Sequence, residues 1–149
     1  MRLIRRLVAR VRAATPDDED GSVLPLAIGY GVLALVLILL CADATSLYLA
    51  QKRLDSLADA AALAGSDGFV LEVVGGAPIA TLTSDGVRSQ AEAVVADVGS
   101  TAVLIAAGTP DGTSARVTVA DTWHPPILTL FVPDGVPLES TATSRTALR

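Results

Sequence analysis

The pattern of hydrophobic positions divides the chain into three parts. Residues 1–20 mix apolar residues with arginines and then become acidic. From Val23 onward, 20 residues carry no charge, which is the length of helix that crosses the hydrocarbon core of a bilayer. The pattern therefore predicts an N-terminal arm over 1–20, a transmembrane helix over about 23–42, and a third part that follows the membrane segment.

The helical pattern continues beyond the uncharged run. Small or apolar residues recur at alternating steps of three and four, which places them along one side of a helix. This apolar stripe consists of Leu47, Ala50, Leu54, Leu57, Ala61 and Ala64. We expect one helix over about 22–64, ended by Gly65, within a segment 21–65. Outside the bilayer, its half-apolar surface needs a cover, either from the rest of the chain or from partner helices.

Residues 66–149 predict a small α+β domain. Residues 66–82 are expected to be a connector, because glycine and proline interrupt them. A helix is expected from Thr83 or Ser84 to about Val98, followed by three or four antiparallel strands. The strands are expected at 101–107, 114–122, 127–132 and 136–148, with tight turns at 110–112 and 133–135. The predicted fold is thus a long N-terminal helix, a short helix and a small antiparallel sheet.

Basic residues predict the orientation in the membrane. Lys and Arg close to a membrane segment tend to stay on the cytoplasmic side. The arm before the apolar run carries five arginines, whereas the first basic residues after it are Lys52 and Arg53. The five are Arg2, Arg5, Arg6, Arg10 and Arg12. We expect a single-pass protein of the cell membrane with its N-terminus in the cytoplasm and residues 43–149 outside.

A secretory signal that is cleaved is the alternative to a membrane anchor. Ala42-Asp43-Ala44 offers a small-x-small cleavage site, but the apolar run exceeds the usual 7–15 residues of a signal peptide. A lipoprotein signal at Cys41 is disfavoured by Leu40, which stands where a small residue is expected. We therefore expect the segment to remain as an anchor.

Composition narrows the possible functions. The chain of 149 residues is 51% hydrophobic and 3% aromatic, with a net charge of -5. Its mean hydropathy of +0.54 is higher than a soluble domain of this size usually has. These values exclude a soluble cytosolic enzyme and argue against nucleic-acid binding. Cys41 is the one cysteine, so no disulfide can form within the chain.

Residues that could carry catalysis or bind metals are few. His124 is the one histidine, and it lies between Trp123 and two prolines, which predicts a surface loop with a packed tryptophan. The acidic run at 17–20 lacks the spacing of a calcium-binding loop. The sequence contains no nucleophile-elbow, phosphate-loop or dinucleotide-binding pattern. We expect no enzymatic activity, no cofactor, no bound metal and no small-molecule substrate.

Asp43 is the carboxylate with the most informative position. It follows the uncharged run directly and lies four residues before Leu47, on the side of the apolar stripe. It can simply mark the membrane boundary, or it can pair with a basic group of a neighbouring subunit or a lipid headgroup. Unchanged assembly of an Asp43→Asn variant would exclude the pairing.

Residues 21–65 resemble the N-terminal region of the TadE/TadG-like proteins of Flp (tight adherence) pilus-assembly systems. The resemblance rests on Gly21-Ser22, Asp43, Tyr48-Leu49-Ala50 and the alanine-rich segment from Ala58 to Gly65. It implies a minor, pilin-like membrane component of an Flp-type pilus or a type II-related secretion apparatus. Such a protein works in assembly at the cell surface, with protein partners of the machinery and without catalysis.

One departure from pilins affects what the resemblance implies. The fifth residue after Gly21 is Leu26, where a processed pilin has a glutamate that assists docking. We therefore expect an uncleaved, TadG-related accessory protein rather than a major pilus subunit. The competing hypothesis is a membrane-tethered module that binds or senses an external ligand through the loop at Trp123 and His124. Co-purification with pilus-machinery proteins would separate the two.

Overall fold

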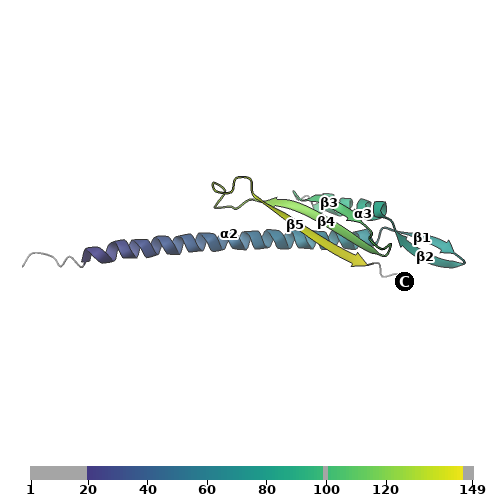
Figure 1. Cartoon of the computed structure of the whole chain (residues 1–149), viewed down its shortest axis with the longest axis horizontal. Helices are drawn as coiled ribbons and strands as arrows, with labels where there is room; N and C mark the ends of the chain where they lie inside the picture. The colour runs from purple at the N-terminus through teal and green to yellow at the C-terminus, as the bar shows by residue number, and fades with distance from the viewer. Residues whose placement is uncertain (1–19, 99–100, 146–149) are drawn as a thin grey trace, which may run out of the picture. The chain divides into compact units, whose positions relative to one another are not determined.

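The computed structural model describes residues 20–98 and 101–145. Helix α2 (Asp20–Ser66) is followed by strands β1 (Phe69–Val74) and β2 (Ala77–Leu82), helix α3 (Ser84–Val98), and strands β3 (Val103–Gly108), β4 (Ser114–Trp123) and β5 (Val136–Arg145), as Figure 1 shows. The α+β class with one long apolar N-terminal helix, a second helix and small antiparallel sheets is confirmed. The five arginines from Arg2 to Arg12, which carry the predicted orientation, lie outside the described residues.

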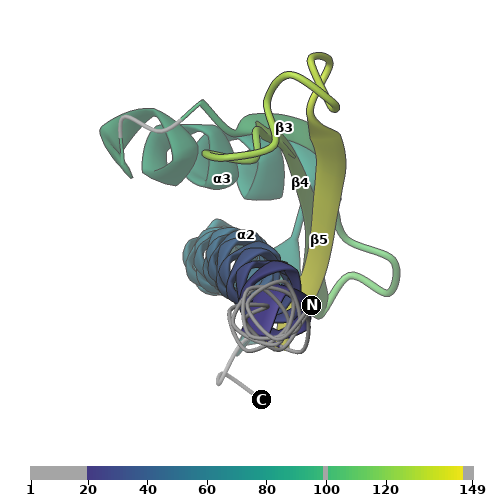
Figure 2. The same ribbon diagram turned by 90° about the vertical axis from the view of Figure 1, so that its left-hand side faces the viewer.

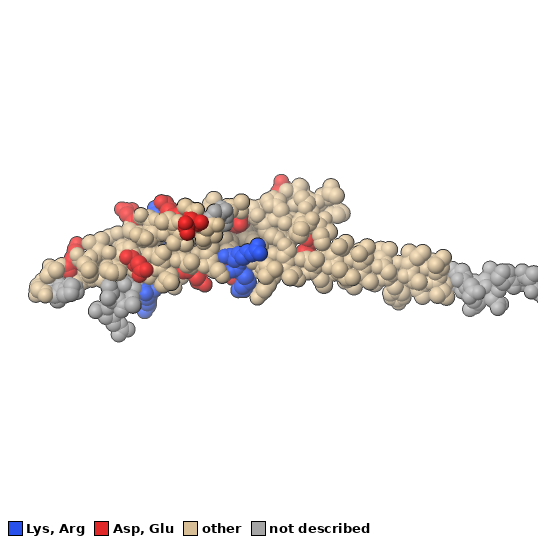
Figure 3. All heavy atoms as spheres, turned by 180° about the vertical axis from the view of Figure 1, so that it is seen from behind, with Lys and Arg blue, Asp and Glu red and all other residues tan. Residues whose placement is uncertain are grey.

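The chain forms two units, Met1–Ala42 and Asp43–Arg149. In the first unit, the large apolar side chains from Val23 to Leu40 are almost all exposed. Pro25 lies inside α2, in its second turn, where it supplies no backbone N–H to the helix. In the space-filling view, this part of the helix displays no charged side chain on the visible face (Figure 3). From Val23 onward α2 is long and apolar enough to cross a membrane.

The second unit is built on a three-stranded antiparallel sheet in the order β3-β4-β5. Side chains alternate between the two faces of a strand, and the central strand follows this rule: Ala115, Val117 and Val119 are buried, whereas Arg116 is exposed. The sequence predicted this strand over 114–122. Helix α3 and the part of α2 that begins at Asp43 lie over the same face of the sheet (Figure 2).

The core forms between these two helices and the sheet. It combines residues from α2, α3 and the central strand, most of them small or β-branched, because the helices approach the sheet closely. Its members include Leu54, Leu57, Ala58, Ala61, Ala62, Val87, Ala91, Val117 and Val119. Helix α3 was predicted with its observed start and end.

Residues 69–82 form a β-hairpin, so the connector expected over 66–82 was wrong. Strands β1 and β2 pair from Phe69 opposite Leu82 to Val74 opposite Ala77. Gly75 and Gly76 have φ of +64° and +87°, the left-handed values that a two-residue hairpin turn of type I′ requires. The glycine pair therefore makes the turn of a hairpin, where the sequence analysis took it as an interruption of regular structure.

Residues 127–132 form no strand, which corrects a second expectation. The backbone N–H groups of Phe131 and Val132 both donate to the carbonyl of Leu128, at 2.9 and 3.1 Å, so the segment closes into turns. Prolines on both sides of it restrict the backbone and supply no N–H for a ladder. The expected turn at 133–135 is present, with Gly135 at a φ of +71°. The last strand was predicted to reach residue 148, beyond the described residues; β5 is described to Arg145.

The turn between β3 and β4 is organised by one carboxylate. Asp111 accepts hydrogen bonds from the Ser114 hydroxyl and backbone N–H at 2.6 Å each, and from the Thr113 N–H at 3.0 Å. These bonds, that of the Ser114 hydroxyl first, hold the pKa of Asp111 well below its usual range. The expected turn at 110–112 is thus fixed by a charged Asp111 and by Gly112, whose φ is +73°.

Candidate functional site

The apolar stripe of α2 packs against the chain's own domain. Leu54, Leu57 and Ala61 are buried in the core, and Leu47, Ala50 and Ala64 are half-buried. The cover that the stripe needs is therefore supplied by the sheet and α3 of the same chain. The predicted role of these six residues in assembly with other subunits stays a prediction.

A row of polar contacts joins α2 to β5 and to the loop before it. We call this row the polar seam; its helix residues are Asp43, Ser46, Gln51, Asp55 and Ser66. Asp43 and Ser46 bond to Ile127 in the β4–β5 loop and to Trp123 at the end of β4. Further along the helix, Gln51, Asp55 and Ser66 bond in chain order to three residues of β5, which are Glu139, Ser140 and Ser144. The seam therefore fixes the direction in which the helix runs along the last strand.

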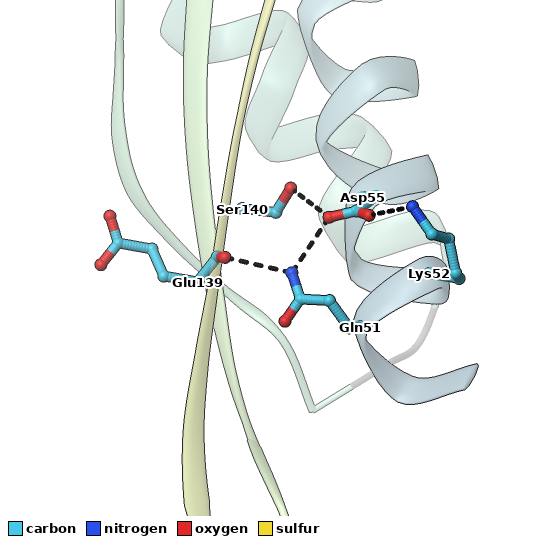
Figure 4. Close-up of polar contacts among 5 residues, drawn as sticks. All are labelled: Gln51, Lys52, Asp55, Glu139 and Ser140. Atoms are coloured by element: carbon cyan, nitrogen blue, oxygen red, sulfur yellow. Dashed lines mark hydrogen bonds and ion pairs between the residues drawn. The ribbon is translucent and has the colours of Figure 1, made fainter. Parts of the chain in front are cut away.

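Asp55 is the centre of the polar seam (Figure 4). Its Oδ1 accepts hydrogen bonds from the Gln51 side-chain amide at 3.0 Å and from the Ser140 hydroxyl at 2.9 Å. Its Oδ2 lies 3.0 Å from the Lys52 Nζ. Gln51 also donates to the carbonyl of Glu139 at 3.3 Å. Gln51 and Asp55, which lie off the apolar stripe, thus link the helix to β5.

These contacts change the acidity of two groups. Hydrogen bonds from Lys52, Gln51 and Ser140, in that order, lower the pKa of Asp55 from 3.8 to about 2. The pKa of Lys52 is raised, first by its hydrogen bond to Asp55 and then by the charge of that carboxylate. Asp55 therefore remains ionised, and an acceptor, at any ordinary pH.

Asp43 lies at the N-terminal end of the polar seam and is buried, with 4% of its surface exposed. Its Oδ1 accepts the backbone N–H of Ile127 at 3.3 Å. Its Oδ2 is buried without a hydrogen-bond partner in the described part of the chain. One turn later, Ser46 accepts the indole N–H of Trp123 at 3.1 Å. Both contacts hold the β4–β5 loop against the first residues of the second unit.

The outer side of α2 in the second unit is exposed. Leu49 and Leu63 are 49% and 61% exposed, and Ser56 and Ala60 lie between them on the same side. Ser56 and Ala60 also line an open groove of about 720 Å³ that reaches Val98 at the end of α3. We call the surface of Leu49, Ser56, Ala60 and Leu63 the outer helix face. Its four side chains are all exposed in the described chain.

Metal-binding and reactive groups do not gather in the part of the chain that the structure describes. Among residues 20–98 and 101–145, no group of three or more His, Cys, Asp or Glu side chains could hold a metal ion. His124 is exposed, and the neighbouring Trp123 is half-buried with its N–H bonded to Ser46. The expectations of no metal, no cofactor and no catalysis stay predictions.

Sequence reasoning missed the polar seam because its members are not periodic. Asp43, Ser46, Gln51, Asp55 and Ser66 are separated by irregular steps, and their partners lie more than 75 residues away in the chain. The run of serines and threonines in β5 is the one available signal, since such residues suit contacts to a polar helix face.

Comparison with known families supports the pilus-assembly hypothesis at a coarse level. Residues 21–77 match the family model described as Putative Flp pilus-assembly TadE/G-like. The chain carries a TadE/G-like segment. The match covers α2 and β1 and reaches the first residue of β2, and it confirms the resemblance found in the sequence. Comparison with curated proteins gave no significant match, and neither did comparison with solved structures. The TadE/G-like segment supports a role related to Flp pilus assembly.

Proposed function

We propose that this TadE/G-like protein is a membrane-anchored, minor pilin-like accessory component of an Flp-type pilus or a related secretion apparatus. The family match over 21–77 carries the proposal, because it covers the helix that would be both anchor and docking element. The N-terminus lies in the cytoplasm and residues 43–149 lie outside. The protein acts in assembly through packing of helices and catalyses no reaction.

The two halves of α2 differ in which side chains they expose, and this difference supports the role. The residues from Val23 to Leu40 expose apolar side chains, as an anchor surrounded by lipid requires. After Asp43 one side of the helix is buried against the chain's own sheet, so the outer helix face remains for other subunits. Leucines at its two ends and a serine and alanine between them allow a partner helix to approach closely.

The experiment is co-purification of the tagged full-length protein from membranes of cells that express the pilus machinery. Leu63→Glu places a charge on the outer helix face, where Leu63 is 61% exposed and tolerates the change in the isolated chain. We expect it to reduce recovery of pilus-assembly proteins about tenfold or more, as loss of a central contact does.

Ile105→Glu is the matched control, since Ile105 is 54% exposed and lies where the β3–β4 register shifts. It should retain the partners. Equal recovery with both variants would contradict packing through the outer helix face. Failure of the wild-type protein to recover any pilus-machinery protein would contradict the proposed function itself.

A further inference from the structure

The loop between β4 and β5 exposes large apolar side chains. Leu130 is 93% exposed and Phe131 is 82% exposed, more than any other large apolar residue whose side chain the structure describes. Ile127 adds a further 40% exposed side chain to the same loop. The loop projects beyond the end of the three-stranded sheet (Figure 1). Exposed apolar groups of this size, gathered at one loop tip, mark a contact surface.

The loop is also free of charge and its backbone is partly closed on itself. Residues 125–133 contain no charged side chain and include three prolines, which have no N–H to satisfy. The N–H groups of Phe131 and Val132 bond to Leu128, and the Thr129 hydroxyl donates to the carbonyl of Pro125. Apolar surroundings penalise every unsatisfied polar group, so such internal bonding suits a loop that leaves water.

The loop is bonded to residues of α2 near the end of the uncharged run. Ile127 is hydrogen-bonded to Asp43, and Trp123 to Ser46. Asp43 is the first charged residue after the uncharged run that begins at Val23, so it stands where the proposed anchor leaves the hydrocarbon. A loop tied to Asp43 therefore lies beside the residue at which the proposed anchor ends.

We propose that the loop of residues 125–133 inserts Leu130 and Phe131 into the interfacial region of the same bilayer that α2 crosses. The protein then touches the membrane at two places, the helix and the loop, which limits rotation and tilt of the domain on its anchor. The occupant of the apolar surface is lipid, with the side chains entering about 5–10 Å, the depth typical of interfacial apolar groups. The inference rests on the membrane anchoring in the proposed function.

Spin labels on the full-length protein in vesicles of palmitoyl-oleoyl phosphatidylcholine and phosphatidylglycerol test the insertion. Single cysteines are introduced in a Cys41→Ala background by Leu130→Cys or Phe131→Cys. Thr113→Cys, in the exposed β3–β4 turn, is the control for water, and Leu33→Cys, in the apolar half of α2, is the control for lipid. Relaxation by oxygen, which concentrates in lipid, is compared with relaxation by the water-soluble complex of nickel with ethylenediaminediacetate.

We expect the oxygen-to-nickel ratio at positions 130 and 131 to be several-fold above that at 113 and closer to that at 33. Ratios at 130 and 131 equal to that at 113, with a lipid value at 33, overturn the insertion and leave the anchor intact. Low accessibility to both reagents at 130 and 131 shows a protein contact, such as a second copy, and also overturns it. A water value at position 33 overturns the anchor, and the insertion with it.

Discussion

At the residue scale, Asp43 and Asp55 of α2 both make contacts within the chain's own fold. Asp43, which by sequence could mark a boundary or pair with a neighbouring subunit, is buried and accepts the N–H of Ile127. Asp55 is paired with Lys52 and bonded to Ser140 on β5. Both carboxylates therefore fix the second unit around the helix, and a pairing of Asp43 with another subunit stays untested.

The carboxylate of Asp55 should make stability depend on acid pH. Its pKa is lowered from 3.8 to about 2 in the folded chain, so the unfolded chain takes up the proton first as the pH falls. The stabilisation is complete above about pH 4 and is lost as the pH falls through about 2. Asp55→Asn should lower the melting temperature at neutral pH, and the difference from wild type should shrink between pH 4 and 2.

Thermal unfolding of the detergent-solubilised protein, followed by circular dichroism across this pH range, measures the effect. Asp59→Asn is the control, because Asp59 is exposed one turn further along α2 and makes no side-chain hydrogen bond or ion pair with the described residues. A difference between Asp55→Asn and wild type that stays constant down to pH 2 would show that the ionised carboxylate contributes nothing.

At the element scale, local signals predicted α2, α3 and the central strand, while two glycine-containing segments differ from expectation. Gly75 and Gly76 make a hairpin turn, and Gly65 lies inside α2, which ends at Ser66. Gly65 is buried, and its φ is not in the left-handed region that a glycine cap adopts. The small size of Gly65 is what the fold requires, because α3 and β4 pass close to it.

Gly65→Ala should therefore destabilise the protein although alanine favours helices. A Cβ at this position would lie 2.9 Å from the Val87 Cγ1 and 3.3 Å from the Ala115 Cβ, both in the core. Overpacking a core typically costs about 1–3 kcal/mol, against about 1 kcal/mol gained in helix propensity, so we expect a net loss of up to about 2 kcal/mol.

Chemical denaturation of the detergent-solubilised full-length protein, followed by the fluorescence of Trp123, measures this loss. Gly29→Ala is the matched control in the same helix, since a Cβ there meets nothing within 4 Å. The control should leave the unfolding transition unchanged. A Gly65→Ala protein as stable as wild type would mean that Val87 can move aside at little cost.

At the scale of the whole molecule, the apolar residues that give the chain its high mean hydropathy lie on surfaces with different surroundings. The first half of α2 exposes its apolar residues, as expected for contact with lipid, and the stripe of the second half is buried by the sheet and α3. The outer helix face and the β4–β5 loop remain exposed in the second unit. A membrane anchor followed by a small domain with one open helix face fits an assembly component.

The proposed orientation predicts a simple pattern of protease protection. In spheroplasts treated with protease from outside, residues 43–149 should be digested and an N-terminal tag should be protected. Replacing Arg2, Arg5, Arg6, Arg10 and Arg12 by asparagine should remove the fixed orientation, because cytoplasmic basic residues set it. Immunoblotting for tags at both ends gives the result, and protection of the C-terminal tag with digestion of the N-terminal one would show the opposite topology.

The sequence by itself determined the elements whose signals are local. An uncharged run, a three-and-four periodicity and the alternation around Val117 predicted the anchor, both helices and β4, and residues 21–65 carry a resemblance that the TadE/G-like family model matches over 21–77. Tertiary structure decided what covers the apolar stripe and turned residues 127–132 away from a strand. It also brought Asp43 to Ile127 and Asp55 to Ser140, across 84 and 85 residues of chain. Such contacts depend on how separate elements pack, and no spacing along one element encodes them.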